Sequence, residues 1–232
     1  MDNAIWTVIY DLPNECRNEY LSWFHEVHIP ETLLRPGYLW AAHYQVIPRK
    51  QRASLARSDA PALPMETGYA ILLGGESTRT FLDPNPTQLE EKDSPETRKM
   101  MARRIRKVSY IHTVEWRVEG PEFNKNDPRG TPGPFVQMGV FDASGQDEDL
   151  GTWYARERMV LWSRVPGSIS GRKLLATLGP QRHGVLYDFI PEEVRQTHFP
   201  RLNGTEWTSR VHSYLVHPHG SAFLGRRIWP PA

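Results

Sequence analysis

One segment of this chain occurs twice, and this repeat restricts the fold more than any other feature of the sequence. The first copy runs from Trp23 to Gly37, the second runs from Trp153 to Gly167, and each ends in a Pro-Gly pair. In both copies the Trp lies thirteen positions before the Pro of that pair. Similarity between two parts of one chain indicates that one supersecondary unit is used twice. We therefore expect two halves in which helices and strands follow the same order.

The first half is expected to contain four strands and two main helices. Runs of β-branched and aromatic residues predict the strands, and apolar residues at helical spacing predict the first helix, which should end or kink at Pro30. Pro95 suits the first turn of the second helix, and basic residues suit its last turn. The strands are predicted at residues 5–10, 38–47, 68–73 and 108–118, and the helices at 15–30 and 95–107.

The second half repeats this order after a stretch, residues 120–134, that is rich in Gly, Pro, Asn and Asp and is typical of a linker. Strands are predicted at residues 135–141, 168–175, 184–189 and 208–216, with a helix through Trp153 and a short helix at 191–198. We therefore expect an N-terminal half at 1–119 that is the active half, a linker at 120–134, a C-terminal half at 135–216 and a C-terminal tail at 217–232 that packs on the body.

Each half has the order βαββαβ, which is that of the ferredoxin-like unit. Such a unit is a four-stranded antiparallel sheet with helices on one face, and its other face must be covered. The second half supplies that cover within the same chain. The predicted fold class is α+β, with two ferredoxin-like βαββαβ halves forming an intrachain α+β barrel.

Composition excludes several classes of function. The 232 residues carry a formal net charge of +1, so no basic excess indicates nucleic-acid binding, and the basic run at 103–107 is interpreted as a solvated helix face. The single cysteine, Cys16, can form neither an internal disulfide nor a cysteine-rich zinc site. No apolar run reaches the ~18–20 residues of a membrane span, and no signal peptide or nucleotide-binding loop is evident. We expect a cytoplasmic protein that binds neither membranes nor nucleic acid.

The first copy of the repeat also resembles a known family. A helix ending in His28-Ile29-Pro30 and followed by a Pro-Gly turn and a strand resembles the dimeric α+β barrel superfamily, and most closely its EthD-like branch. The similarity covers residues 5–46 well and residues 135–175 weakly. It implies a pocket in each half between sheet and helices, and a duplicated chain equivalent to the usual dimer. Members of this superfamily include cofactor-free monooxygenases, lactone isomerases, dehydratases and heme enzymes.

The two copies differ where chemistry is expected. His25 and His28 of the first copy align with Ala155 and Arg158 of the second. Histidine titrates near neutral pH and can accept or donate a proton, whereas Arg stays charged. The difference favours one active half and one structural half.

His28 is the first candidate for a catalytic acid or base, because histidine suits that role and His28 also matches the family motif. Its alternative role is to cap the helix end. His25 lies three positions earlier on the same helical face. His43 and His112 are predicted on strands from which side chains could converge on one pocket, although each alone could be an ordinary core residue. The catalytic candidates are therefore His28, His25, His43 and His112, and the substrate-binding candidates are Tyr38, Trp40, Tyr69 and Tyr110.

No metal site and no cofactor are expected. The histidines at 25 and 28 are three positions apart, whereas the helical His-Glu-x-x-His zinc motif places them four apart. The leading hypothesis is a cofactor-independent lyase, isomerase or dehydratase that uses histidine for proton transfer on a small apolar or aromatic carbonyl or lactone. One alternative is a cofactor-free monooxygenase of phenolic compounds, and another is a non-enzymatic small-molecule binding or accessory protein. Association of two chains into a homodimer stays open.

Overall fold

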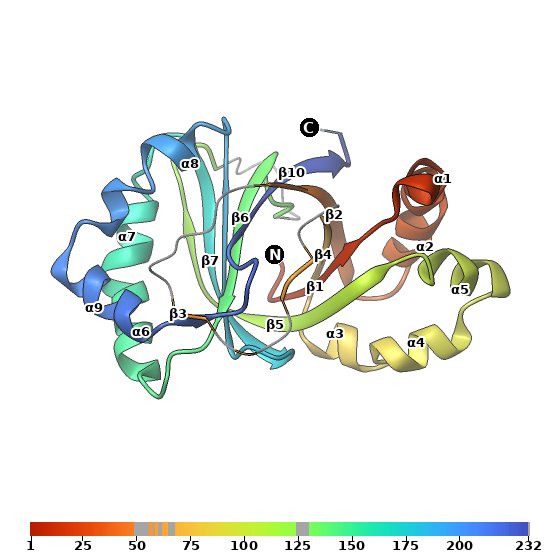
Figure 1. Cartoon of the computed structure of the whole chain (residues 1–232), viewed down its shortest axis with the longest axis horizontal. Coiled ribbons are helices and arrows are strands. Elements are labelled where there is room, and N and C mark those ends of the chain that lie inside the picture. The colour runs from red at the N-terminus through yellow and green to blue at the C-terminus, as the bar shows by residue number, and fades with distance from the viewer. Residues whose placement is uncertain (49–55, 58, 60–61, 65–67, 124–129, 232) are drawn as a thin grey trace.

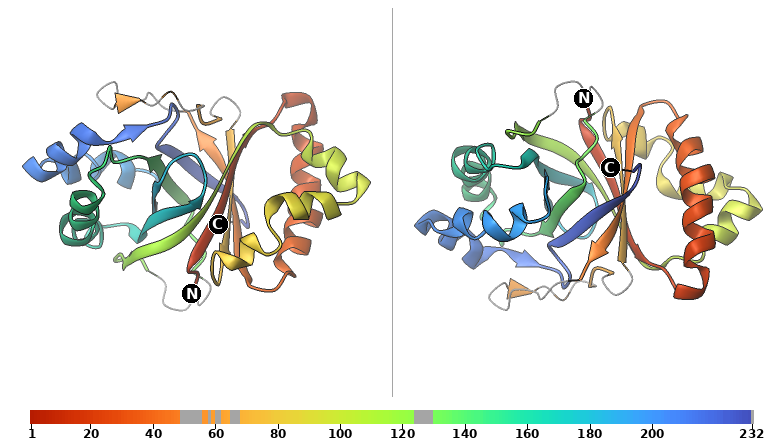
Figure 2. Two further views of the ribbon diagram at one scale, coloured as in Figure 1. Left: turned by 90° about the horizontal axis from the view of Figure 1, so that it is seen from below. Right: turned by 90° about the horizontal axis from the view of Figure 1, so that it is seen from above.

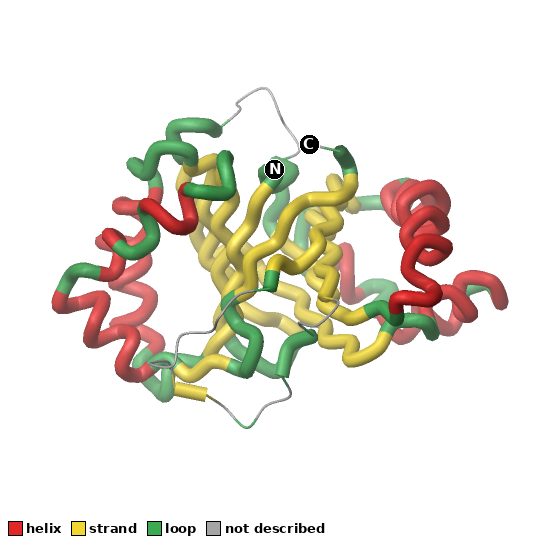
Figure 3. The backbone as a smooth tube through the Cα atoms, turned by 45° about the horizontal axis from the view of Figure 1, so that its top comes forward, coloured by secondary structure: helices red, strands yellow, loops and turns green. Residues whose placement is uncertain are grey.

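The computed structural model describes residues 1–48, 56–57, 59, 62–64, 68–123 and 130–231. Eight strands close one barrel, and the helices form two groups on opposite sides of it (Figure 1). Both end-on views in Figure 2 show the helices only on the outer faces, and Figure 3 shows the strands between the two groups. The protein is an α+β barrel formed by one chain. Parts of the loop at 48–66 and of the linker at 120–134 lie outside the described residues.

The first half has the expected order of elements. Its barrel strands are β1 (Ala4–Asp11), β2 (Tyr38–Ile47), β4 (Gly68–Gly75) and β5 (Ile105–Glu119). They lie side by side in the order β5-β1-β4-β2, so β1 and β4 are the central strands. The helices are η1 (Asn14–Cys16), α1 (Arg17–Trp23), η2 (Phe24–His28), α2 (Ile29–Leu33), α3 (Arg79–Leu82), α4 (Pro86–Lys92) and α5 (Pro95–Met101).

The second half arranges its strands in the same way. Its barrel strands are β6 (Phe135–Phe141), β7 (Ser168–Leu178), β8 (His183–Phe189) and β10 (Phe223–Trp229). Their order is β10-β6-β8-β7, which matches the order β5-β1-β4-β2 of the first half element by element. The helices are α6 (Asp147–Trp153), η3 (Tyr154–Arg158), α7 (Met159–Trp162), α8 (Val194–Thr197), η4 (Arg201–Asn203) and α9 (Glu206–Tyr214).

The two sheets join at two seams. β5 pairs with β7 and β2 pairs with β10, and every neighbouring pair in the barrel is antiparallel. Outside the barrel, β3 (Ala56–Arg57) pairs in parallel with β9 (Val216–His217). The predicted fold class of two ferredoxin-like halves in one barrel is confirmed.

The repeated segment folds alike in both halves. η2 and η3 are π-helical turns of five residues at the same place in the two copies, each between two α-helices. Gly37 and Gly167, which end the copies, have positive φ angles of 81° and 83°, a conformation that glycine adopts without the penalty of a side chain. Pro30 does not end the helix as predicted, because it occupies the first turn of α2, where its missing N–H is tolerated.

The end of the second half differs from the prediction. Residues 208–216, predicted as a strand, fall largely in α9. Thr205 caps this helix by accepting a hydrogen bond from the backbone N–H of Thr208, and the buried Thr208 and Val211 have helical spacing. The final strand is β10, in which Leu224 pairs with Ile47 of β2. The segment predicted to be a tail therefore closes the barrel.

The second main helix of the first half is shorter than predicted. α5 ends at Met101 and β5 begins at Ile105, so the basic run at 103–107 spans the junction between them. Arg106 has a positive φ of 52°, and its Nη2 lies 2.7 Å from Oδ2 of the buried Asp11. The prediction of one solvated helix face at 103–107 is wrong.

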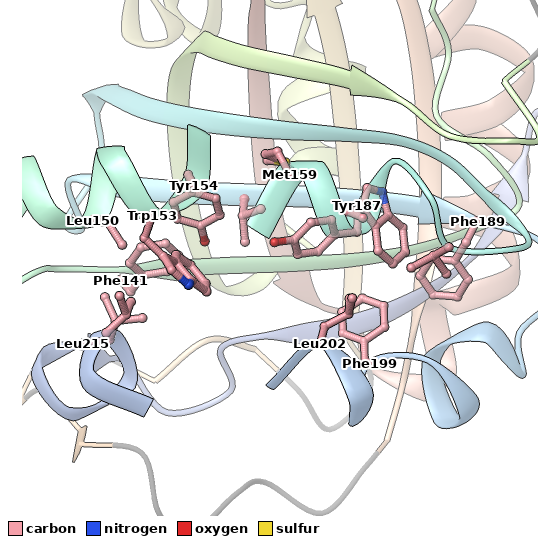
Figure 4. Close-up of a cluster of buried hydrophobic side chains, with 14 of the residues drawn as sticks. Phe141, Leu150, Trp153, Tyr154, Met159, Tyr187, Phe189, Phe199, Leu202 and Leu215 are labelled. Atoms are coloured by element: carbon pink, nitrogen blue, oxygen red, sulfur yellow. The ribbon is translucent and has the colours of Figure 1, made fainter. Parts of the chain in front are cut away.

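Three groups of buried side chains hold the layers together. One fills the barrel and includes Ile9, Leu72 and Met138. The other two lie between the outer faces of the sheets and the helices, and Figure 4 shows the one in the second half, with Trp153, Phe199 and other aromatic residues. In the part of the chain that the structure describes, no helix is long and apolar enough to cross a membrane.

Candidate functional site

A cavity of about 130 Å³ lies in the first half, between the outer face of the sheet and the helices. A cavity of roughly 150 Å³ accommodates a benzene ring, so this space suits a small molecule of about one ring. Its wall is mainly apolar and combines side chains from β1, β4, η2, α2, α4 and α5. The apolar lining residues are Trp6, Val8, Phe24, Ile29, Ile71, Leu73, Pro86, Leu89 and Met101.

His28 lies in this wall at the end of the π-helical turn. Its ring stacks on Phe24, with centroids 5.4 Å apart, and contacts Trp23 at 5.1 Å. Burial, followed by the positive charges of Arg104 and Arg35, lowers the pKa of His28 to about 3. The imidazole is therefore neutral near pH 7 and retains a nitrogen lone pair that can accept a proton.

Arg104 supplies a half-buried cation to the same cavity. Its guanidinium carbon lies 4.1 Å from the ring centroid of Tyr10 and 4.8 Å from that of Phe24, and its Nε donates to the Tyr20 hydroxyl at 2.6 Å. Its Nη2 is buried and has no hydrogen-bond partner. An unpaired buried donor costs about 1–3 kcal/mol, so a ligand oxygen that accepts from Nη2 would be stabilising.

Other charges around the cavity are partly neutralised. Nζ of Lys107 lies 2.7 Å from Oε1 of Glu90, and both side chains are largely exposed. Asp93 and Arg35 also line the space, and burial raises the pKa of Asp93. Among the described lining residues, Arg104 and Arg35 are half-buried cations that have no carboxylate within ion-pair distance.

His25 of η2 and His43 of β2 form a hydrogen-bonded chain beside the cavity. Nε2 of His25 lies 2.8 Å from Nδ1 of His43, and Nε2 of His43 lies 2.9 Å from the Tyr10 hydroxyl. Burial, then His25 and Arg104, holds the pKa of His43 well below its ordinary value, so this ring is neutral. The chain ends on the phenol whose ring contacts Arg104. His25 and His43 therefore position the cation and do not line the cavity.

His112 does not join this group. Tyr110 and His112 are two positions apart on β5 and lie on the face that points into the barrel, where their rings stack at 5.4 Å. Neither ring nitrogen of His112 has a hydrogen-bond partner, and burial followed by the charge of Lys173 lowers its pKa to about 3. The predicted convergence of His112 with His28 is wrong, because the two side chains lie on opposite faces of the sheet.

The four predicted substrate-binding residues lie outside the cavity wall. Trp40 and Tyr110 belong to the group that fills the barrel. Tyr69 faces the helices and contacts the His43 ring in a tilted arrangement at 5.4 Å, and Tyr38 packs edge-on against Phe81 at 5.1 Å. Tyr69 thus supports the histidine chain, and Tyr38 belongs to the core of the first half.

Sequence reasoning missed Tyr10 and Arg104. Alternation along β1 places Tyr10 on the same face as Trp6 and Val8, so period-two spacing contained a signal for it. Arg104 gave no such signal, because it lies between a helix end and a strand start where neither periodicity applies.

The residues present do not indicate a metal or a heme. Over the described residues, no three His, Cys, Asp or Glu side chains are grouped so that they could hold a metal ion. The superfamily that the sequence resembles includes heme enzymes. However, a cavity of about 130 Å³ is smaller than the roughly 300–1,000 Å³ of pockets for larger ligands. A heme does not fit the first-half cavity as it stands.

Comparison with known proteins supports the fold. No protein-family model and no curated protein sequence matches the chain. Solved structures do match. A chlorite dismutase-like protein is 14% identical with a TM-score of 0.63, covering 98% of this chain and 96% of that one. An anthrone oxidase-like protein is 10% identical with a TM-score of 0.59, covering 98% and 92%.

A chlorite dismutase from Candidatus Nitrospira defluvii is 9% identical with a TM-score of 0.55, and the match covers 97% of this chain and 91% of that one. Identities this low show the fold alone. The chain therefore shares the α+β barrel fold of these neighbours over nearly the whole length of each chain.

Proposed function

We propose that the first half is a cofactor-independent lyase, isomerase or dehydratase that moves a proton on a small carbonyl compound bound beside Arg104. The observation that carries the proposal is that one apolar cavity holds both a neutral imidazole and a half-buried guanidinium whose buried Nη2 has no acceptor. The apolar wall suits an aliphatic or aromatic body, and the unpaired N–H groups suit an oxygen that carries negative charge.

The proposed step removes a proton from the carbon next to a carbonyl group. The electron pair of that C–H bond moves to the carbonyl oxygen and forms an enolate, and the proton passes to the free ring nitrogen of His28. Arg104 stabilises the negative charge of the enolate oxygen in a mainly apolar cavity. Return of the proton to another carbon completes an isomerisation, and its transfer to a departing hydroxide completes a dehydration.

The low pKa of His28 is compatible with this role, because the charge of Arg104 is one of its causes. When an anionic oxygen pairs with Arg104, the repulsion between the guanidinium and a protonated His28 becomes smaller, and the enolate attracts the imidazolium. His28 should therefore become more basic as the enolate forms.

We further propose that the chain is a duplicated, EthD-like member of its superfamily that acts in the cytoplasm. The matching π-helical turns and strand orders of the two halves support duplication. Pairing of two chains is not required to close the barrel, so a homodimer would form through outer surfaces.

Deuterium incorporation tests the proposed reaction. A panel of small keto acids, aromatic ketones and lactones is incubated with the protein in D2O, and exchange next to the carbonyl is followed by proton NMR. His28→Gln should slow exchange of an accepted compound by roughly 10²- to 10⁴-fold, the usual contribution of general acid–base catalysis. His219→Gln, which changes an exposed histidine outside the cavity wall, is the control. Full exchange in His28→Gln, or saturable binding without exchange, would refute the proposal and favour a binding protein.

A further inference from the structure

We propose that the second half contains an independent binding site for a small carboxylate, built around Arg158. This inference goes beyond the proposed function, which concerns the first half alone. It also revises the expectation from sequence that the second half is only structural.

A second cavity, of about 100 Å³, lies between the outer face of the second-half sheet and its helices. Aromatic rings from β6, α6, η3, β8 and the segment after α8 line it, and Figure 4 shows these side chains gathered along the same layer. The aromatic lining residues are Phe141, Trp153, Tyr154, Tyr187 and Phe199.

Arg158 lies in the wall of this cavity at the position that corresponds to His28, and only 6% of its surface is exposed. Its Nε donates to the Tyr187 hydroxyl at 2.9 Å, and its Nη1 donates to the Leu202 carbonyl and to Oδ1 of Asn203, both at 3.2 Å. All three acceptors are neutral. Nη2 has no acceptor among the residues that the structure describes, so its two N–H groups are available to a ligand.

No carboxylate balances this buried charge at ion-pair distance within the described parts of the chain. The neighbouring Glu157 directs its Oε1 to Trp153, Thr205 and Thr208. The described lining residues include no Asp or Glu, whereas Arg195 is a second cation in the wall and donates to Gln137. A buried cation without a counterion is energetically unfavourable, and a bound anion would neutralise its charge.

The chemistry of the wall selects the class of ligand. A guanidinium with a free nitrogen hydrogen-bonds a carboxylate well, and the aromatic rings favour a short apolar body. At about 100 Å³, this cavity is smaller than the cavity of the first half, which suits about one ring, so the apolar body of its ligand should be smaller than one ring. Replacement of a titratable His by a permanently charged Arg suits anion binding and not proton transfer.

Fluorine NMR with trifluoroacetate, a small carboxylate with an apolar head, tests this site. The wild type is expected to bind trifluoroacetate at two sites, one in each half, which appear as two binding components. Arg104→Gln should remove the component of the first half and leave the other, and Arg158→Gln should weaken the remaining component at least tenfold. Loss of all binding in Arg104→Gln, or unchanged binding in a natively folded Arg158→Gln, would overturn the proposal.

Arg195→Gln keeps the proposal testable if Arg158→Gln fails to fold, because Arg195 is only half-buried. A severalfold loss of the second component in this variant supports the site, and unchanged affinity contradicts it. Trifluoroacetamide, a neutral molecule of similar shape, serves as the matched ligand. It should not compete with trifluoroacetate, and equal competition would show that the site does not recognise negative charge.

Discussion

Replacement of Arg104 by Met should weaken anion binding without unfolding the protein. The variant loses the 2.6 Å hydrogen bond from Nε to Tyr20 and the contacts with the rings of Tyr10 and Phe24. A charge-assisted hydrogen bond contributes about 1.5–3 kcal/mol, and each cation–π contact contributes about 0.5–2 kcal/mol. The variant also removes the unpaired buried Nη2, which costs about 1–3 kcal/mol in the wild type. The losses exceed this gain, so the free energy of unfolding should fall by about 3 kcal/mol, which is less than the roughly 5–15 kcal/mol stability of an ordinary domain.

The affinity for a small aromatic carboxylate should also fall in this variant. If benzoate accepts one charge-assisted hydrogen bond from Nη2, its loss corresponds to a roughly 10- to 150-fold weaker Kd. Calorimetric titration with benzoate and urea denaturation measure the two quantities. Arg103→Met is the matched control, because Arg103 pairs with the exposed Glu19 at the surface and should affect neither quantity appreciably. Unchanged benzoate affinity in Arg104→Met would refute the assignment of Arg104 as the anion-binding group.

Three further predictions concern single residues. The folded-state pKa of His28, about 3, lies below its unfolded value, so the unfolded chain binds more protons between about pH 6.5 and 3 and stability falls as pH falls. His28→Gln should remove about 1.4 kcal/mol per pH unit from that slope in urea melts, and an unchanged slope contradicts the burial of a neutral ring. His43→Leu should lower the free energy of unfolding by at least about 1–3 kcal/mol, because it removes the His43 partner of the buried Tyr10 hydroxyl. A smaller loss of stability in thermal melts would argue against the hydrogen-bonded chain. Gly167→Ala should destabilise more than Gly37→Ala, since a Cβ at Gly167 would lie 2.2 Å from a backbone oxygen, whereas at Gly37 it would meet a side chain at 2.8 Å; equal losses on urea denaturation contradict this.

The sequence predicted the fold well where local chemistry and tertiary structure agree. The Pro-Gly turn before Tyr38 and the β-branched and aromatic run after it defined a strand whose ends match β2. Residues 208–216 were misassigned because their apolar positions fit both a two-residue and a 3.6-residue period. β10 was missed because its pairing depends on partners in β2 and β6 that lie far away in the sequence.

The candidate site was predicted less completely than the fold. His28 could be found because a helix places it beside the cavity, and its surroundings follow from local spacing. His43 and His112 both lie on strands, and only the register of the closed barrel places the first toward the helices and the second into the interior. Arg104 packs against three aromatic rings from β1, α1 and η2, and no local sequence pattern predicts that these elements meet.

The titration of His28 tests most directly whether the pKa of its ring rises when an anion binds to Arg104. Proton NMR would follow the His28 ring signals from pH 8 to pH 4 with and without saturating benzoate, using His28→Gln to assign them. Without ligand, these signals should not titrate in this range, because burial and the nearby cations lower the pKa of His28 to about 3. With benzoate bound, the pKa should rise into the range measured. A saturated complex in which His28 still does not titrate would contradict the coupling between Arg104 and His28.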